Sequence, residues 1–185
     1  MSAGMSDEQL MGLIGDGDKQ AFQQFLLRHL KNIMRFVTRY TGKHDAEDIA
    51  QEAFTRVWTH AGTWKDQGVS PVSWLYRVSY NLSMDHLRRR KPAESEDAIA
   101  ELAGNVQMEP EQQAINNSQE KLLQQALSFL PERQYTALTL CAWQGLSNRD
   151  ASSIMGISVD ALESLLSRAR RSLKQLLTET KGQTS

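Results

Sequence analysis

The chain has 185 residues and a formal net charge of −1 at pH 7, with 21 Lys and Arg against 22 Asp and Glu. This length suits two small domains, and the near-neutral charge argues against a protein that binds duplex DNA unaided over a broad basic surface. The single cysteine excludes an internal disulfide, and the cysteine and histidines show no metal-binding spacing. The sequence contains no signal peptide and no membrane-spanning stretch, so we expect a cytoplasmic protein.

Two helices are predicted near the N-terminus. Ser6 is a suitable N-cap for a short helix that ends at Ile14, and a longer helix runs from about Asp18 to Tyr40, before Gly42. Apolar residues of the longer helix recur about one turn apart and should cover one side of a bundle: Phe22, Phe25, Leu26, Leu30, Ile33, Met34 and Val37. Three arginines fall outside this stripe: Arg28, Arg35 and Arg39.

The stretch DAEDIAQEAFTRVW, residues 45–58, predicts a further helix with two different faces. One face is apolar: Ile49, Ala50, Ala53, Phe54, Val57 and Trp58. The opposite face is acidic, with a glutamine among the acids: Asp45, Glu47, Asp48, Gln51 and Glu52. The helix dipole favours acidic side chains near a helix N-terminus, so this face is typical of capping as well as of a binding surface.

The next helix begins with Ser70 as N-cap and Pro71 in the first position, and it ends at Arg90, before Pro92. We expect its apolar residues to face inward: Val72, Leu75, Val78, Leu82 and Leu87. Rings, an amide and a basic run make up the rest: Trp74, Tyr76, Tyr80, Asn81, Arg88, Arg89, Arg90 and Lys91. Aromatic rings stack on unpaired bases with about 1 to 3 kcal/mol each, so this surface could hold melted DNA open. The basic run also has a purely structural explanation, because cations stabilise the C-terminus of any helix.

A flexible acidic linker is predicted from Pro92 to Pro110, where Gly104 and two prolines interrupt any helical period. The stretch 93–120 contains no Lys or Arg, while it holds several Asp and Glu residues. Two interpretations fit this composition. The linker is an inert tether, or it mimics nucleic acid within a positively charged channel.

Helical periodicity returns at about Glu111, and we place the second domain at residues 111–180. Its first apolar stripe consists of Ala114, Ile115, Leu122, Leu123, Ala126, Leu127 and Leu130. Pro131 begins the next helix, LPERQYTALTLCAWQG, which is expected to end at Gly145.

The last two predicted helices form a helix-turn-helix. Ser147 caps NRDASSIM, Gly156 ends it, and Ser158 caps a final helix from Val159 to about Thr178. The inward face of the final helix is expected to be Leu162, Leu165, Leu166, Ala169, Leu173, Leu176 and Leu177. The outward face is expected to be Glu163, Ser164, Ser167, Arg168, Arg170, Arg171 and Lys174. The glycine turn and the caps favour a helix that enters the major groove, and the alternative is a bundle helix with a solvated basic face.

The two helices within residues 45–90 resemble region 2 of extracytoplasmic-function (ECF) sigma factors, the promoter-specificity subunits of bacterial RNA polymerase. The resemblance rests on DAEDIAQEAFTRVW followed by SWLYRVSYNLSMDHLRRR. It implies that the acidic helix docks on a coiled coil of the largest polymerase subunits through Asp48, Gln51 and Glu52. It also implies that the next helix melts and reads the downstream promoter element, with Asn81 lining a pocket for a flipped base. The implied promoter contacts are Trp64, Trp74, Tyr76, Asn81, Arg88 and Arg89.

The segment LPERQYTALTLCAWQGLSNRDASSIMGISVDALESLLSRARRSL resembles region 4 of the same family, which reads the upstream promoter element. The upstream contacts implied in the final helix are Glu163, Ser164, Ser167, Arg168 and Arg171. The sequence departs from the family at Glu163 and Leu165, where many members carry basic residues. A glutamate accepts a hydrogen bond from cytosine but repels phosphate, so we expect weaker upstream binding with a sequence preference of its own.

The resemblance identifies the chain as an ECF member of the sigma-70 family with an all-α fold. It implies two small helical domains, residues 6–91 and 111–180, joined by the acidic linker at 92–110. The implied partners are core RNA polymerase, promoter DNA and an anti-sigma factor, often membrane-anchored. No enzyme activity, cofactor or small-molecule substrate is expected, because no phosphate loop, nucleophile elbow or catalytic metal cluster is present.

Two alternatives belong to other classes. A duplex-binding regulator would need only the helix-turn-helix, but not the acidic and aromatic helices that precede it. A metal-dependent hydrolase would use His44, Asp45, Glu47 and Asp48, which are better explained as residues of a helix start. The other histidines, His29, His60 and His86, have no partner at an informative spacing, and Cys141 is expected to be a small core residue.

Overall fold

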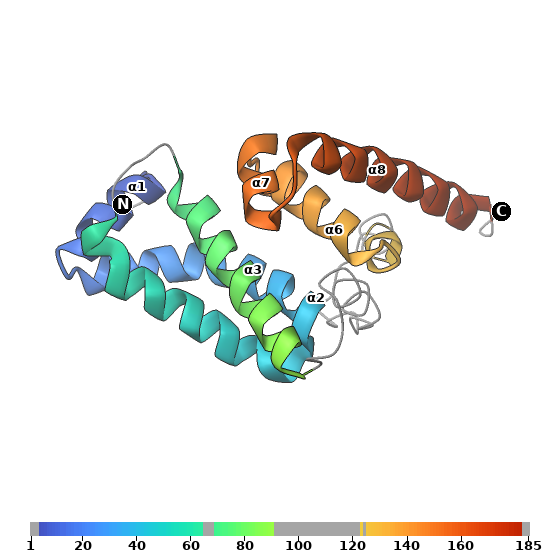
Figure 1. Cartoon of the computed structure of the whole chain (residues 1–185). Coiled ribbons are helices and arrows are strands. Elements are labelled where there is room, and N and C mark those ends of the chain that lie inside the picture. The colour runs from blue at the N-terminus through green and yellow to red at the C-terminus, as the bar shows by residue number, and fades with distance from the viewer. Residues whose placement is uncertain (1–3, 65–68, 91–122, 124, 183–185) are drawn as a thin grey trace. The chain divides into compact units, whose positions relative to one another are not determined.

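The computed structural model describes residues 4–64, 69–90, 123 and 125–182, with side chains placed as far as 178. Every regular element among these residues is helical, which confirms the predicted all-α class. The chain forms two compact units, Met1–Pro92 and Ala93–Ser185 (Figure 1). The predicted acidic linker and the first three residues of the stripe after Glu111 lie outside the described residues, whereas Ala126, Leu127 and Leu130 of that stripe are buried. Within the described part, no helix is both long and apolar enough to cross a lipid bilayer.

Helix α1, Asp7–Gly15, begins with a capping box. The Gln9 amide donates to Ser6 Oγ at 3.3 Å, and the Ser6 amide donates to Gln9 Oε1 at 2.8 Å, so two N–H groups at the helix start are satisfied. Leu10, Met11 and Ile14 are buried on one face. The predicted first helix is therefore present, with the predicted cap.

Helix α2, Lys19–His60, has a sharp break at Gly42. Asp18 caps its start by accepting hydrogen bonds from the Gln20 and Ala21 amides at 2.8 and 3.1 Å. The backbone at Gly42 has φ 77° and ψ 169°, a conformation that is nearly restricted to glycine. The predicted end of the long helix near Gly42 is thus a kink, after which the chain immediately resumes a helix.

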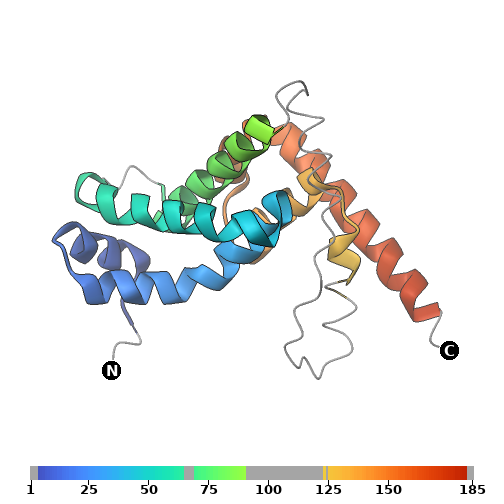
Figure 2. The same cartoon turned by 90° about the horizontal axis from the view of Figure 1, so that it is seen from below.

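The two halves of α2 pack antiparallel to each other, as the blue and teal parts of the ribbon show in Figure 2. The rings of Phe22 and Trp58 lie 5.3 Å apart in an edge-to-face arrangement, and those of Phe25 and Phe54 lie 6.5 Å apart. The short 3₁₀ helix η1, Ala61–Thr63, then contacts α1. The apolar stripe predicted for residues 45–58 lies on the inner side of this pair of helix halves, since all its members are buried except Trp58, which is half-buried.

Helix α3, Pro71–Arg90, packs across α2, and its predicted N-cap is present. The Ser73 amide donates to Ser70 Oγ at 3.1 Å. The predicted inward face was partly wrong, because only Leu75 of the five apolar residues is fully buried. The remaining buried positions of the helix are Pro71, Ser73, Tyr76, Ser79 and Ser83. Small serines allow α3 to lie close to α2, and their hydroxyls can bond to carbonyls of their own helix.

The N-terminus of α1 is tied to α2 through Asp7. Its carboxylate forms an ion pair with Arg28 and lies 3.0 Å from Nε2 of the buried His29. Partial burial alone would raise the pKa of the Asp7 carboxyl, but the hydrogen bonds and charges of His29 and Arg28 outweigh burial and hold this pKa below its ordinary value. No spacing in the sequence indicated a partner for His29, and the structure gives it one that lies 22 residues away.

We expect the substitution Asp7→Asn to lower the free energy of unfolding by about 1 to 2 kcal/mol at pH 7, because it removes charge-assisted hydrogen bonds. The folded pKa lies below the unfolded value of 3.8, so the carboxylate stabilises the fold above that pH and loses this effect as the pH falls through the folded value. Urea unfolding at pH values from 7 down to 3 would measure this. A difference between variant and wild type that stays constant with pH would contradict the assignment.

In the second unit, the helix predicted from Pro131 to Gly145 is divided into two parts. Helix α6, Glu132–Leu138, continues into a π-helical turn, η2, at Thr139–Trp143. Gly145, with φ 66°, follows this turn as predicted. Helices α7, Asn148–Met155, and α8, Val159–Gly182, complete the unit (Figure 1).

The helix-turn-helix is formed by α7 and α8, and its turn has the predicted chemistry. Ser147 Oγ accepts from the Asp150 amide at 3.1 Å, and Ser158 Oγ accepts from the Ala161 amide at 3.1 Å. Gly156, with φ 64°, is the left-handed residue that ends α7. Of the predicted inward face of α8, Leu162, Leu166 and Ala169 are buried, whereas its other four leucines are half-buried.

Candidate nucleic-acid interface

The acidic residues singled out from the sequence lie together on the outside of α2. Asp48, Gln51 and Glu52 are exposed, while Ile49 and Ala50 between them are buried. We call these three exposed residues the acidic face. Glu52 forms an ion pair with Arg56 one turn later, with Oε1 and Nε 2.9 Å apart. The other carboxylate, Asp48, has its full charge available at the surface for a basic partner.

The aromatic and amide candidates differ in their exposure. Asn81 is exposed on α3, and Trp74, one turn after the start of the same helix, is half-buried. The ring of Trp74 lies 6.2 Å from that of His60. Trp64 is half-buried directly after η1, where its amide donates to the Ala61 carbonyl at 3.2 Å. These three side chains can therefore reach a ligand at the surface of the first unit.

Tyr76 was wrongly predicted to be a DNA contact. It is only 1% exposed, and its ring packs edge-to-face on Phe36 with 5.0 Å between the ring centres. The sequence places Tyr76 between Leu75 and Arg77, and the serine-rich face of α3 turns this ring inward rather than outward. Arg39, expected outside the apolar stripe of α2, is also buried. We remove Tyr76 from the candidate interface.

The substitution Tyr76→Ala should lower the free energy of unfolding by about 3 to 5 kcal/mol, the range for deleting a large buried ring. The expected cause is a cavity next to Phe36, whose ring contact is lost. Urea unfolding followed by circular dichroism would measure the change. A decrease below about 1 kcal/mol would mean that the ring is not part of the core.

The arginines at the basic end of α3 have different bonding partners. Arg88 and Arg89 are exposed, and both bond to Asp85: Arg88 Nη1 donates to its carboxylate at 3.2 Å and Arg89 Nε to its backbone carbonyl at 3.3 Å. Arg90 turns toward α2 and donates to Asp45 Oδ2 at 3.1 Å. Within the run predicted as one basic patch, Arg88 and Arg89 therefore bond within α3, while Arg90 reaches across to α2.

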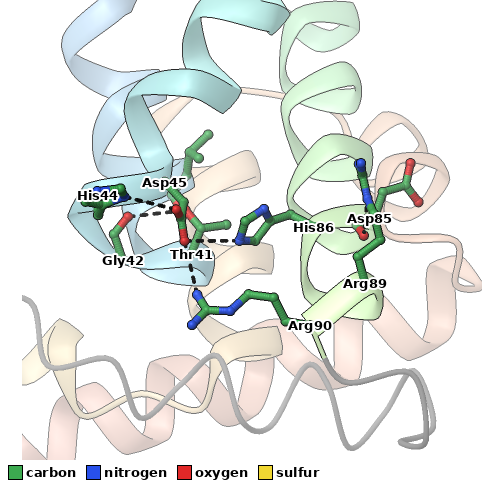
Figure 3. A network of polar contacts seen from close by, with 9 residues as sticks. Thr41, Gly42, His44, Asp45, Asp85, His86, Arg89 and Arg90 are labelled. Atoms are coloured by element: carbon green, nitrogen blue, oxygen red, sulfur yellow. Dashed lines mark hydrogen bonds and ion pairs between the residues drawn. The ribbon is translucent and has the colours of Figure 1, made fainter.

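Asp45 is the centre of a polar network between α2 and α3 (Figure 3). Its Oδ2 also lies 3.1 Å from His86 Nε2, and its Oδ1 lies 3.2 Å from His44 Nδ1. These contacts, with the nearby charge of Arg90, lower the pKa of the Asp45 carboxyl, and the hydrogen bond with His44 is the largest cause. No spacing in the sequence indicated a partner for His86, and the structure gives it Asp45, 41 residues away. Among the described residues, no group of three or more potential ligands is placed to hold a metal ion.

A hollow of about 300 Å³ lies between the acidic face and the end of α3. It is lined by Asp48, Ile49, Glu52, Leu82, His86, Arg89 and Arg90. Acidic side chains thus form one wall and basic side chains the other. The two predicted surfaces of the first unit are neighbours, which the sequence alone did not show.

The candidates in α8 are all exposed: Glu163, Ser164, Ser167, Arg168 and Arg171. Glu163 is held from α7, because Asn148 Nδ2 donates to Glu163 Oε1 at 3.2 Å. Asn148 was not singled out from the sequence, and only its place at the start of α7 could have drawn attention to it. The half-buried Cys141 has its Sγ 3.7 Å from Asn148 Oδ1, and burial raises the pKa of this thiol.

Comparison with known proteins matches both units. The family models described as Sigma-70 region 2 and Sigma-70, region 4 match residues 25–93 and 120–173. The RNA polymerase sigma-H factor of Pseudomonas aeruginosa is 32% identical over 182 residues, which cover 92% of this chain and 93% of that protein. The ECF RNA polymerase sigma-E factor of Haemophilus influenzae is 29% identical over 185 residues, which cover 94% of this chain and 96% of that protein.

A solved structure agrees with these relatives. The sigma factor RpoE from Bartonella quintana, in a complex with the anti-sigma factor NepR, has a TM-score of 0.62 and 26% identity, and the match covers 85% of this chain and 96% of that chain. CnrH, in a complex with the cytosolic domain of CnrY, has the same fold, with a TM-score of 0.60 and 24% identity. The order of the two matched regions, the exposed acidic face and the helix-turn-helix all agree with the sequence-based resemblance. This chain belongs to the sigma-70 family, as an extracytoplasmic-function sigma factor of RNA polymerase.

Proposed function

We propose that this chain binds core RNA polymerase, directs it to specific promoters and opens the promoter DNA. The observation that supports this most is the placement of an exposed acidic face next to an aromatic and basic helix within one unit that matches sigma region 2. A regulator that binds only duplex DNA needs neither surface. The polymerase supplies the nucleotidyl transfer chemistry, so the chain itself acts in the cytoplasm as a non-enzymatic subunit.

The residues divide into three roles in this proposal. The acidic face, Asp48, Gln51 and Glu52, docks on the polymerase, where its exposed carboxylates meet basic side chains. Trp64, Trp74 and Asn81 engage unpaired bases of the downstream element, and Arg88 and Arg89 bind its phosphates. The exposed face of α8 binds the upstream element, where Glu163 is suited to accept a hydrogen bond from a cytosine amine.

An anti-sigma factor is the proposed regulatory partner. The Bartonella quintana relative has been solved in a complex with such a factor. A partner that covers the acidic face would block polymerase binding, because that surface is otherwise open to solvent. The partner needs basic or hydrogen-bonding side chains opposite Asp48 and Glu52.

In vitro transcription with bacterial core polymerase, the purified chain and a genomic DNA library tests the proposed function. We expect discrete transcript starts that share two spaced upstream motifs, and the starts should disappear when the chain is omitted. The motifs would also reveal the preference of the Glu163 helix. Absence of transcripts together with tight binding to duplex DNA without polymerase would instead identify an independent helix-turn-helix regulator.

A further inference from the structure

Asp45 connects the helix that bears the acidic face to the far end of α3. Its position on α2 is one turn before Asp48 and two turns before Glu52. Its partners Arg90 and His86 are 45 and 41 residues away and occupy the last two turns of α3. The side chain of Asp45 is 27% exposed, so these contacts are formed at a partly buried junction between the two helices.

The contacts of Asp45 distinguish Arg90 from the other cations at the end of α3. Figure 3 shows His86 and Arg90 pointing toward Asp45, whereas Arg89 donates to the backbone carbonyl of Asp85 in its own helix. Arg90 is the cation that Asp45 retains, at 3.1 Å. Arg88 and Arg89 are also exposed, but they bond to Asp85 of their own helix.

We infer that Asp45 is a positioning residue for promoter opening: it fixes the last turns of α3 against α2 so that Arg88 and Arg89 face the DNA. This inference rests on the proposed function, in which α2 contacts the polymerase and α3 contacts the promoter. A fixed junction at Asp45 holds the DNA-binding end of α3 at a defined angle to the docked helix. A loosened junction leaves both surfaces present but no longer aligned.

The sign of the effect distinguishes positioning from simple electrostatics. Asp45→Asn removes one negative charge near a helix end that binds DNA, and charge alone predicts stronger attraction to phosphate. Positioning predicts the opposite result, slower opening, because Arg90 and His86 lose the negative charge of their shared acceptor, and the amide that replaces one carboxylate oxygen cannot accept. Glu47→Gln is the matched control, since it makes the same change of charge at an exposed position two residues away.

The test uses the full chain assembled with core polymerase on a promoter that the wild type opens. Opening is followed by permanganate reactivity of unpaired thymines, core affinity by competition binding, and folding by circular dichroism. We expect Asp45→Asn and Arg90→Gln each to slow opening by about tenfold while core affinity stays within about twofold. The double variant should open no more slowly than the slower single variant, because both changes break one contact. Glu47→Gln should open at the wild-type rate.

Three results would overturn the inference: Asp45→Asn opens the promoter as fast as the wild type or faster, it weakens core binding as much as opening, or the effects of the two single changes multiply. If Asp45→Asn does not fold, the Arg90→Gln variant decides the question, because the Arg90 side chain is 63% exposed. Opening at the wild-type rate in this variant overturns the inference. Slowed opening with intact core binding supports it. Failure of the wild-type chain to bind core polymerase or open any promoter would instead contradict the proposed function.

Discussion

Replacing both Asp48 and Glu52 by alanine should weaken binding to core polymerase by about 100- to 1000-fold, because each lost interfacial charge pair costs about 2 kcal/mol or more. Both side chains are exposed on α2, so the fold should be retained. The intramolecular loss is limited to the surface ion pair of Glu52 with Arg56, which contributes about 0.3 to 0.5 kcal/mol. Fluorescence competition with labelled chain on core polymerase would measure the affinity, and far-ultraviolet circular dichroism would check the helical content.

A matched double control is Glu8→Ala with Glu47→Ala, which removes two exposed acids from helices of the same unit but leaves the acidic face intact. This control should bind core polymerase as the wild type does. Loss of binding in both double variants would indicate a general charge effect. Unchanged binding in Asp48→Ala with Glu52→Ala would remove the acidic face from the docking surface.

Asn81→Ala and Trp74→Ala should each slow promoter opening by about 10- to 100-fold with core affinity unchanged, since one stacked or hydrogen-bonded base is worth about 1 to 3 kcal/mol. Asn81 is exposed on α3, so its removal leaves the core intact. Trp74 is half-buried, and its ring is positioned near that of His60 at 6.2 Å. Permanganate footprinting of the assembled polymerase would report opening, while competition binding would report assembly.

The specificity of this effect can be checked on a promoter with a premelted bubble. Because the bases are already unpaired there, Asn81→Ala should regain most of its activity if Asn81 stabilises a flipped base. Tyr76→Phe is a second check, because its buried ring keeps the packing on Phe36 and should leave opening unchanged. Equal losses of core binding and opening in Asn81→Ala would indicate a folding defect.

The features that could be predicted from the sequence are those that local chemistry specifies. The acidic face follows from the apolar period of residues 49–57, since the side chains between the buried positions must face outward. The break at Gly42 and the turn at Gly156 follow from backbone conformations that glycine adopts readily. The caps at Ser70, Ser147 and Ser158 follow from hydroxyls that accept from amides at helix starts.

The features that were missed depend on the burial of a polar helix face and on contacts between distant residues. The hydroxyls of Ser79 and Ser83 donate to carbonyls one turn earlier at 2.8 Å. Because these hydroxyls are satisfied within the helix, the polar face that carries them can be buried. Tyr76 therefore faces the core, whereas the sequence had been interpreted to place it at the surface. The partners of Asp45 come from another helix, so no spacing within either helix predicts them. Hydrophobic period alone therefore misplaced the inner face of α3 and left His86 without a partner.

The antiparallel arrangement within α2 also bears on the order in which the chain folds as it is synthesised. The rings of Phe25 and Phe54 meet across only 29 positions of sequence, and contacts of short sequence separation form early. Domains generally fold from the N-terminal side first during translation, so the two halves of α2 can close around Gly42 before α3 has left the ribosome. The proposed polymerase-binding surface is then available to a cellular partner before the proposed DNA-binding surface has been made.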